Sequence, residues 1–128
     1  MGRKSAIEGV IDLSDFEEYK PKKAEEIDKA TISKSGIHLS RKISNKIGKK
    51  YKYCEIKYKL DGKRLIIALL LKKSKTDKSL TLVRTEYNTI RIRCTGLSKK
   101  FNIKDVINAD KVYWNDRETL ILEFPLSD

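Results

Sequence analysis

Alternating apolar and polar residues predict a β-hairpin in the middle of the chain. In "YCEIKYKLDGKRLIIALLL", every second residue from Cys54 to Leu60 is apolar, and the residues between them are charged. Such alternation is typical of a strand with one buried face, and Asp61-Gly62 is a strong signal for the turn that follows. The next strand, "LIIALLL", is apolar on both faces, so we expect it to be a central or interface strand.

A second hairpin is predicted in "KVYWNDRETLILEF", with its turn near Asn115-Asp116. The second strand of this hairpin would point Leu120, Leu122 and Phe124 into the core. Between the two hairpins, residues 72–79 read "KKSKTDKS". This polar, basic composition is typical of a loop or linker.

Each hairpin is preceded by a short segment with helical spacing. In "SRKISNKIG", Ile43 and Ile47 lie four residues apart on one face, Ser40 can cap the first turn, and Gly48 suits the left-handed residue after the last turn. The second segment repeats this arrangement in its own residues. Thr95 is the expected cap, Leu97 and Phe101 form the apolar pair, and Asn102 takes the left-handed position. A strand, a short helix and a hairpin are therefore predicted twice.

The two predicted units, residues 30–71 and 80–124, align with offsets of only 53 to 55 residues. We interpret this similarity between the two units as a tandem duplication. The alternative is that two segments rich in Ile and Lys resemble each other by chance. The aligned apolar residues are Ile37, Leu39, Ile43, Ile47, Tyr58, Leu65 and Ile67 in the first unit and Ile90, Ile92, Leu97, Phe101, Tyr113, Leu120 and Leu122 in the second.

The segments "KSGIHLSRKISNKIG" and "CEIKYKLDGKRLII" resemble the AbrB-like (SpoVT/AbrB, swapped-hairpin) family of small DNA-binding proteins, and "VRTEYNTIRIRCTGLSKKFNI" with "LILEF" resembles it more faintly. The resemblance implies an interleaved barrel built from two copies of the unit, which presents Arg and Lys to DNA in transcription regulation. This chain departs from the family at Ser35-Gly36, where Gly-Arg is usual, and at Ser40, where Pro is common. Only Arg84 and Lys99 match the DNA-contacting positions of the family directly.

We therefore expect an α+β, β-rich fold in which the duplicated unit forms a small swapped-hairpin-like barrel. Residues 29–128 would be one compact domain, and residues 1–28 would be an acidic arm. Apolar residues make up 39% of the chain and charged residues 37%, which predicts a small core under a highly charged surface. The arm includes "VIDLSDFEEY" and is interpreted either as disordered or as a segment that orders on a partner.

The charge distribution favours a polyanionic partner. The net charge is +11, yet residues 29–104 hold 22 Lys and Arg against four Asp and Glu. Such a concentration of positive charge is typical of nucleic-acid binding, and phosphate contacts would make the binding strongly dependent on salt. Lys side chains mostly contact phosphates, whereas Arg can also read a guanine edge.

The predicted nucleic-acid-binding residues surround the first helix, the strand "IRIRC" and the second helix. Tyr51 and Tyr53 are proposed to stack on an unpaired base, with packing at the rim of the core as the alternative. In "IRIRC", Arg91 and Arg93 would face outward while Ile90, Ile92 and Cys94 point inward. The predicted set is Arg41, Lys42, Lys46, Lys49, Lys50, Lys52, Arg84, Arg91, Arg93, Lys99 and Lys100.

The sequence gives little support for an enzyme or a cofactor. Glu55-Ile56-Lys57 is half of a metal-dependent nuclease signature, but a cross-strand ion pair explains it more simply. Cys54 and Cys94 are interpreted as reduced core thiols, although a disulfide between them is conceivable. His38 is the single histidine, which speaks against a zinc site. We expect a non-enzymatic protein with no cofactor and no metal.

The rival interpretation is a protein-binding module of the antitoxin or inhibitor kind. Its arm would bind a partner protein through Ile11, Leu13 and Phe16. The longest apolar run has seven residues, against roughly 20 for a membrane-spanning helix, so we expect no membrane partner and a cytoplasmic location. The sequence allows a monomer or a homodimer.

Overall fold

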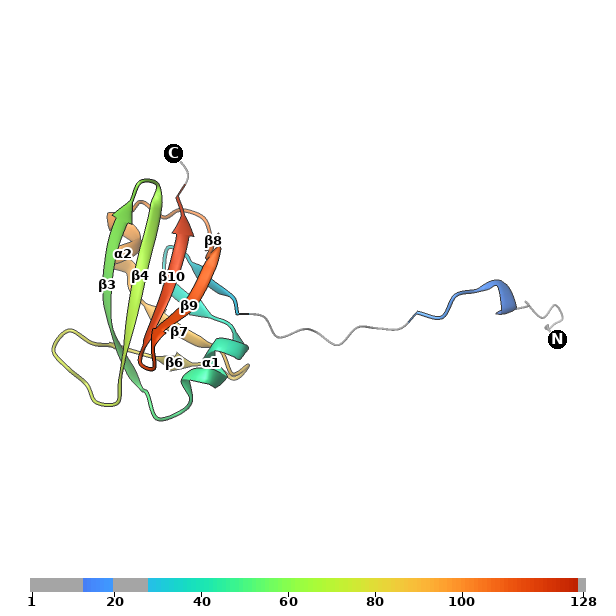
Figure 1. The fold of residues 1–128 in the computed structure, drawn as a ribbon, viewed down its shortest axis with the longest axis horizontal. Helices are drawn as coiled ribbons and strands as arrows, with labels where there is room; N and C mark the ends of the chain where they lie inside the picture. Colours follow the sequence, from blue (N-terminus) through green and yellow to red (C-terminus); the bar gives the residue numbers. More distant parts are fainter. Residues whose placement is uncertain (1–12, 20–27, 127–128) are drawn as a thin grey trace.

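A computed structural model describes residues 13–19 and 28–126 of the chain (Figure 1). The strands of residues 28–126 form two antiparallel five-stranded sheets, whose inner faces share one hydrophobic core. Sheet A has the strand order β6-β7-β2-β1-β8, and sheet B has the order β5-β3-β4-β10-β9. The expectation of a β-rich α+β fold is confirmed.

The strands of sheet A are two to four residues long, whereas the central strands of sheet B have seven and nine. Sheet A consists of β1 (Ala30–Ile32), β2 (Gly36–Leu39), β6 (Val83–Arg84), β7 (Ile90–Arg93) and β8 (Ile107–Asn108). Sheet B consists of β3 (Tyr53–Asp61), β4 (Arg64–Lys72), β5 (Leu80–Thr81), β9 (Lys111–Asp116) and β10 (Thr119–Pro125). The helices are α1 (Arg41–Ile47), α2 (Thr95–Lys100) and the 3-10 turn η1 (Leu13–Asp15).

The centre of sheet B is the antiparallel pair β4 and β10. Ile67 lies opposite Leu122 in this pair, and both side chains are fully buried. The neighbouring inward residues are equally buried, and burying each such aliphatic or aromatic side chain contributes about 1.5–3 kcal/mol. The prediction that "LIIALLL" forms a central strand is confirmed.

Both helices form where the spacing predicts them, and both end in a left-handed residue. Gly48 has φ 75° after α1, and Asn102 has φ 55° after α2. The residues that cap the N-termini of the two helices differ from the prediction. The Ser40 side chain makes no cap hydrogen bond to the helix and instead accepts one from the backbone N–H of Lys29 at 3.1 Å. Thr95 is the first residue of α2, and Cys94 occupies the position before it.

The hairpin turns lie one or two residues later than predicted. Asp61 pairs with Arg64, so the first loop is Gly62-Lys63, with Gly62 at φ 63°. A positive φ at the first loop residue suits the twist of a tight hairpin. The second loop is Arg117-Glu118, and the Asp116 carboxylate accepts a hydrogen bond from the Glu118 N–H at 2.9 Å.

The expectation of a closed barrel is wrong for the part of the chain that the structure describes. The edge strands of sheet A, β6 and β8, have only two residues each, and both pair only with strands of their own sheet. Such short edges end the hydrogen-bonded ladder instead of extending it to the longer strands of sheet B. The proposed barrel is therefore replaced by two sheets that enclose one core.

The order strand, helix, hairpin does occur twice among the described residues. β2, α1, β3 and β4 form the first series, and β7, α2, β9 and β10 form the second, with β8 inserted after α2. β2 pairs with β7, and β4 pairs with β10. The two series thus occupy corresponding places in the two sheets, whereas their origin by duplication stays a prediction.

We predict that Gly36→Ala destabilises the fold by about 3 kcal/mol or more. Gly36 has φ 143°, and a Cβ there would lie 2.0 Å from the carbonyl oxygen of Ile92 on the paired strand β7. Gly96→Ala is the matched control, because a Cβ at Gly96 meets nothing within 4 Å, and it should change stability by less than about 1 kcal/mol. Urea unfolding of both variants checks this. Equal midpoints would contradict the close approach of β2 and β7.

Candidate nucleic-acid interface

The outer face of sheet A carries one row of residues that crosses all five of its strands. Strand register places His38 between Thr31 of β1 and Arg91 of β7. Asn108 and Val83 complete the row at the two edges. Cross-strand neighbours on one face lie about 4.5–5.5 Å apart at their Cβ atoms, so these side chains form one continuous surface.

Arg91 and Arg93 both point outward from β7, as the sequence predicts. Ile90 and Ile92 are fully buried, and Cys94 is 9% exposed, whereas both arginines are exposed. Among the residues that the structure describes, neither arginine forms an ion pair with a carboxylate. The outward strand residues of sheet A also include no Asp or Glu, so this face carries positive charge that no nearby strand residue neutralises.

His38 lies at the centre of this face. Its Nε2 atom is 3.2 Å from the Thr89 hydroxyl oxygen, which is 2.7 Å from the Thr85 hydroxyl oxygen. Burial lowers the pKa of His38 below its ordinary value of 6.5, and the positive charge of Arg91 lowers the pKa further. The imidazole is therefore mainly neutral at pH 7, because both burial and the charge of Arg91 disfavour its protonated form.

The cations of α1 and its exit lie at one end of the sandwich, where Lys46 and Lys50 line a hollow with Trp114, Asp116 and Arg117 of sheet B and its hairpin loop. The remainder of the helix exit contacts the edge of sheet A. The Arg84 guanidinium on β6 donates a hydrogen bond to the Gly48 carbonyl oxygen. The Asn88 side chain, in the turn between β6 and β7, donates to the Asn45 side chain at 3.3 Å. These contacts join the helix to the edge of sheet A. The predicted residues in this group are Arg41, Lys42, Lys46, Lys49, Lys50, Lys52 and Arg84.

Lys99 and Lys100 belong to the opposite end of the molecule. Because β2 and β7 are antiparallel, the helices that follow them leave sheet A at opposite ends, as Figure 1 shows for α1 and α2. Lys100 lies over the Tyr58 ring, with its Nζ atom 5.9 Å from the ring centroid. The eleven predicted cations thus divide into a set on sheet A and around α1, whose Lys46 and Lys50 face the β9–β10 hairpin, and a separate pair on α2.

The proposal that Tyr51 stacks on a base does not fit this conformation. Tyr51 is only 6% exposed, and its hydroxyl donates a hydrogen bond to Glu118 at 2.7 Å. Lys50 covers the ring, with its Nζ atom 5.1 Å from the centroid. Tyr51 lies before β3 begins, so the inward and outward alternation of that strand does not determine where the Tyr51 side chain points. Tyr53, on β3, is half-buried and belongs to sheet B.

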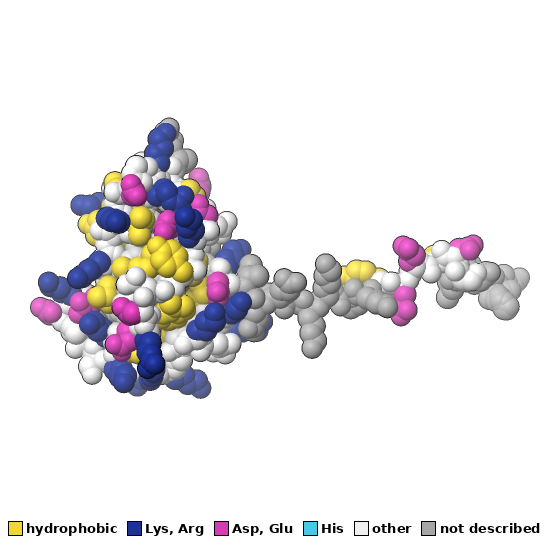
Figure 2. Space-filling model, in the orientation of Figure 1, with side chains coloured by type: hydrophobic (Ala, Val, Ile, Leu, Met, Phe, Trp, Pro, Cys, Tyr) yellow, Lys and Arg dark blue, Asp and Glu magenta, His cyan; other side chains and the backbone are white. Residues whose placement is uncertain are grey.

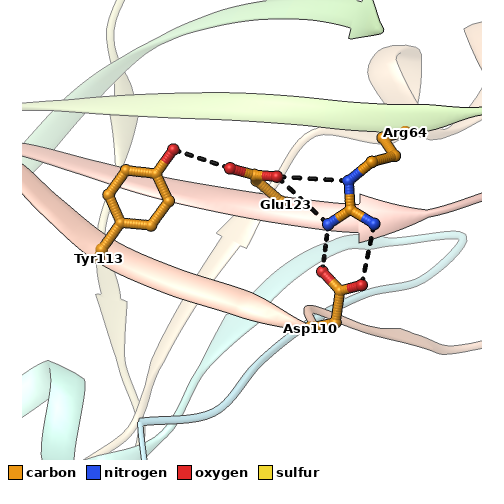
Figure 3. A network of polar contacts seen from close by, with 4 residues as sticks. All are labelled: Arg64, Asp110, Tyr113 and Glu123. Atoms are coloured by element: carbon orange, nitrogen blue, oxygen red, sulfur yellow. Dashed lines mark hydrogen bonds and ion pairs between the residues drawn. The ribbon is translucent and has the colours of Figure 1, made fainter. Parts of the chain in front are cut away.

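Sequence reasoning missed a polar network on the outer side of sheet B (Figure 3). Arg64 donates to both Asp110 oxygens and to the Glu123 carboxylate, which also accepts a 2.8 Å hydrogen bond from the Tyr113 hydroxyl. These bonds lower the pKa values of Asp110 and Glu123. The network ties the segment before β9 to β4 and β10. The Arg64 guanidinium is already occupied by two carboxylates, so the network resembles a structural clamp more than an anion site.

The other chemical candidates are engaged in packing. Cys54 and Cys94 are buried free thiols, as expected, and burial raises the pKa of Cys54 to about 12. Glu55 of the half nuclease signature accepts a 2.7 Å hydrogen bond from the Thr76 hydroxyl. Within residues 13–19 and 28–126, no group of three His, Cys, Asp or Glu side chains could hold a metal ion. No helix in these ranges has the length and hydrophobicity needed to cross a membrane.

The predicted partner-binding residues fall at the edge of the described chain. Ile11 lies outside the described residues, and Leu13 begins the 3-10 turn η1. Phe16 is 66% exposed, and Tyr19 is 83% exposed. Neither aromatic side chain is buried against the core in this conformation.

Comparison with protein-family models, with curated proteins and with solved structures found no match to this chain. The resemblance to the AbrB-like family therefore stays a prediction from the sequence. The functional interpretation below therefore rests on the charge and exposure of the residues on the outer face of sheet A.

We predict that Arg91→Gln raises the pKa of His38 toward 6.5 without fully restoring it, because burial, the larger cause, remains. Arg93→Gln is the matched control, since Arg93 does not contribute to the shift. NMR titration of the one histidine ring reads the pKa directly. Because the folded pKa is lowered, His38 stabilises the fold above pH 6.5, and this contribution is lost as the pH falls through the folded value. An identical pKa of His38 in the unaltered protein, in Arg91→Gln and in Arg93→Gln would contradict the electrostatic contact between Arg91 and His38.

Proposed function

We propose that this protein binds nucleic acid through the outer face of sheet A, as a non-enzymatic regulator of the AbrB-like kind. The observation that carries the proposal is the outward pair Arg91 and Arg93 beside a neutral His38, on strands whose outward residues include no carboxylate. Guanidinium groups in this setting suit phosphate oxygens, and they also suit the edge of guanine.

Duplex DNA is the ligand that this surface suits best. Recognition of single strands relies on large aromatic platforms, and the outward strand residues of sheet A include no Phe, Tyr or Trp. Lys49 and Lys50, exposed at the exit of α1, would extend the phosphate contacts beyond the sheet edge. The equivalent order of elements in the two halves supports a duplicated, AbrB-like origin, which we propose together with the function.

A protein-binding role is the second candidate. The exposed Phe16 and Tyr19 favour it, because they lie among Asp15, Glu17 and Glu18 in a segment whose aromatic side chains are not buried. In this function the protein would act as an antitoxin or inhibitor, and a partner protein would cover the segment. Loss of partner capture upon deletion of residues 1–28, with nucleic-acid binding retained, would distinguish the two roles.

We predict that Arg91→Glu with Arg93→Glu weakens binding to duplex DNA roughly tenfold or more. The slope of log affinity against log salt should also fall by about two, because each lost phosphate contact removes about 0.9. Fluorescence anisotropy at several salt concentrations measures both quantities, with single-stranded DNA and RNA of equal length as further probes.

Lys73→Glu with Lys75→Glu is the matched control. It makes the same change in net charge at exposed positions between β4 and β5. The control should lose less affinity and keep most of the salt slope. Equal losses in the two variants would show that net charge alone drives binding, and tighter binding to a single strand would contradict duplex recognition.

A further inference from the structure

The outer face of sheet B differs chemically from that of sheet A. Ile66 and Ala68 on β4 and Ile121 on β10 point outward from the central strands, opposite the core. Together with Tyr113 on β9, they line a shallow hollow of about 330 Å³. Figure 2 shows apolar side chains gathered on this side of the molecule, with Lys and Arg around them.

Positive charge borders one side of this hollow. Lys57 and Lys59 of β3 line it, both are exposed, and neither forms an ion pair with a residue that the structure describes. The nearby carboxylate of Glu123 is occupied by Arg64 and Tyr113. An apolar surface next to unneutralised cations suits an occupant with apolar side chains among carboxylates.

The chain itself contains a segment with this composition. Residues 13–19 read "LSDFEEY", in which Asp15, Glu17 and Glu18 accompany the exposed aromatic residues Phe16 and Tyr19. Their charge is opposite to that of Lys57 and Lys59. Their aromatic rings match a hollow lined by aliphatic and aromatic side chains.

The connection between this segment and the hollow is long enough. The Asp28 carboxylate lies 3.6 Å from the Lys46 Nζ atom, and Lys46 lines a surface hollow together with Trp114 of β9. Tyr113, on the opposite face of the edge strand β9, lines the hollow of sheet B, so the connection passes round this edge. From β9 to β4 is two strand spacings, about 10 Å, whereas the eight residues between Tyr19 and Asp28 can span roughly 27 Å.

We propose that the acidic segment Leu13–Tyr19 docks, within the same chain, into the apolar hollow on the outer face of sheet B. Phe16 and Tyr19 bury their rings against Ile66, Ala68 and Ile121, and the acidic side chains pair with Lys57 and Lys59. The docking covers a face that lies opposite the outer face of sheet A. It goes beyond the proposed binding of nucleic acid and does not depend on it.

NMR amide shifts of the full-length protein test the docking. Phe16→Ala with Tyr19→Ala should shift the amides of Lys57, Ala68 and Ile121 and leave those of sheet A unchanged. Tyr87→Ala removes another exposed aromatic ring, in the turn between β6 and β7, and as the matched control should leave the hollow unchanged. Changes confined to residues near positions 16 and 19 would overturn the proposal.

A second variant changes the hollow instead of the acidic segment. Ala68→Glu places a carboxylate in the hollow, and the amides of residues 13–19 should move to the shifts of a synthetic peptide covering residues 8–19. Amide dispersion confirms that this variant remains folded. Unchanged shifts of residues 13–19 in the folded variant would contradict the docking. Shifts at the hollow that disappear upon dilution would instead assign it to the segment of a second copy and overturn docking within one chain.

Discussion

β4 and β10 pair side by side from Arg64–Pro125 to Leu70–Thr119, and the rest of the molecule is arranged around this contact. Each of the two strands carries a hairpin partner on its other side, β3 next to β4 and β9 next to β10. The inward residues of the pair, such as Ile67 and Leu122, are fully buried under sheet A. Loss of this pairing would separate the two hairpins and expose the buried side chains on their inward faces.

The same pairing explains why the two outer faces differ. β4 and β10 are central, so their outward residues can remain apolar, and they leave a hollow between the polar edges of sheet B. Sheet A is built from short strands that contribute few inward residues, and its outward positions carry His38, Arg91 and Arg93. One domain thereby presents a cationic, polar surface on one side and an apolar surface bordered by lysines on the other. Two surfaces of different chemistry are consistent with two different ligands.

Local signals predicted much of this structure. Gly48 and Asn102 end their helices because a left-handed residue is a short-range requirement, and alternation placed Arg91 and Arg93 on the outside of β7. The division into two sheets depends on which edges pair across long distances, and no local pattern encodes that choice. The Arg64 network was missed because its carboxylates lie 46 and 59 residues away in the sequence. The packing of Tyr51, which the sequence left as the alternative to base stacking, depends on a hydrogen bond to Glu118, 67 residues away in the sequence.

Native-state hydrogen exchange measures the central contact most directly, since the slowest amides mark the part of a fold that opens only upon global unfolding. The amides of β4 and β10 that bond to each other should exchange slowest, with one common free energy of opening. The strands of sheet A should open at lower free energy. Slower exchange in β2 and β7 than in β4 and β10, or independent opening of the two central strands, would contradict the account.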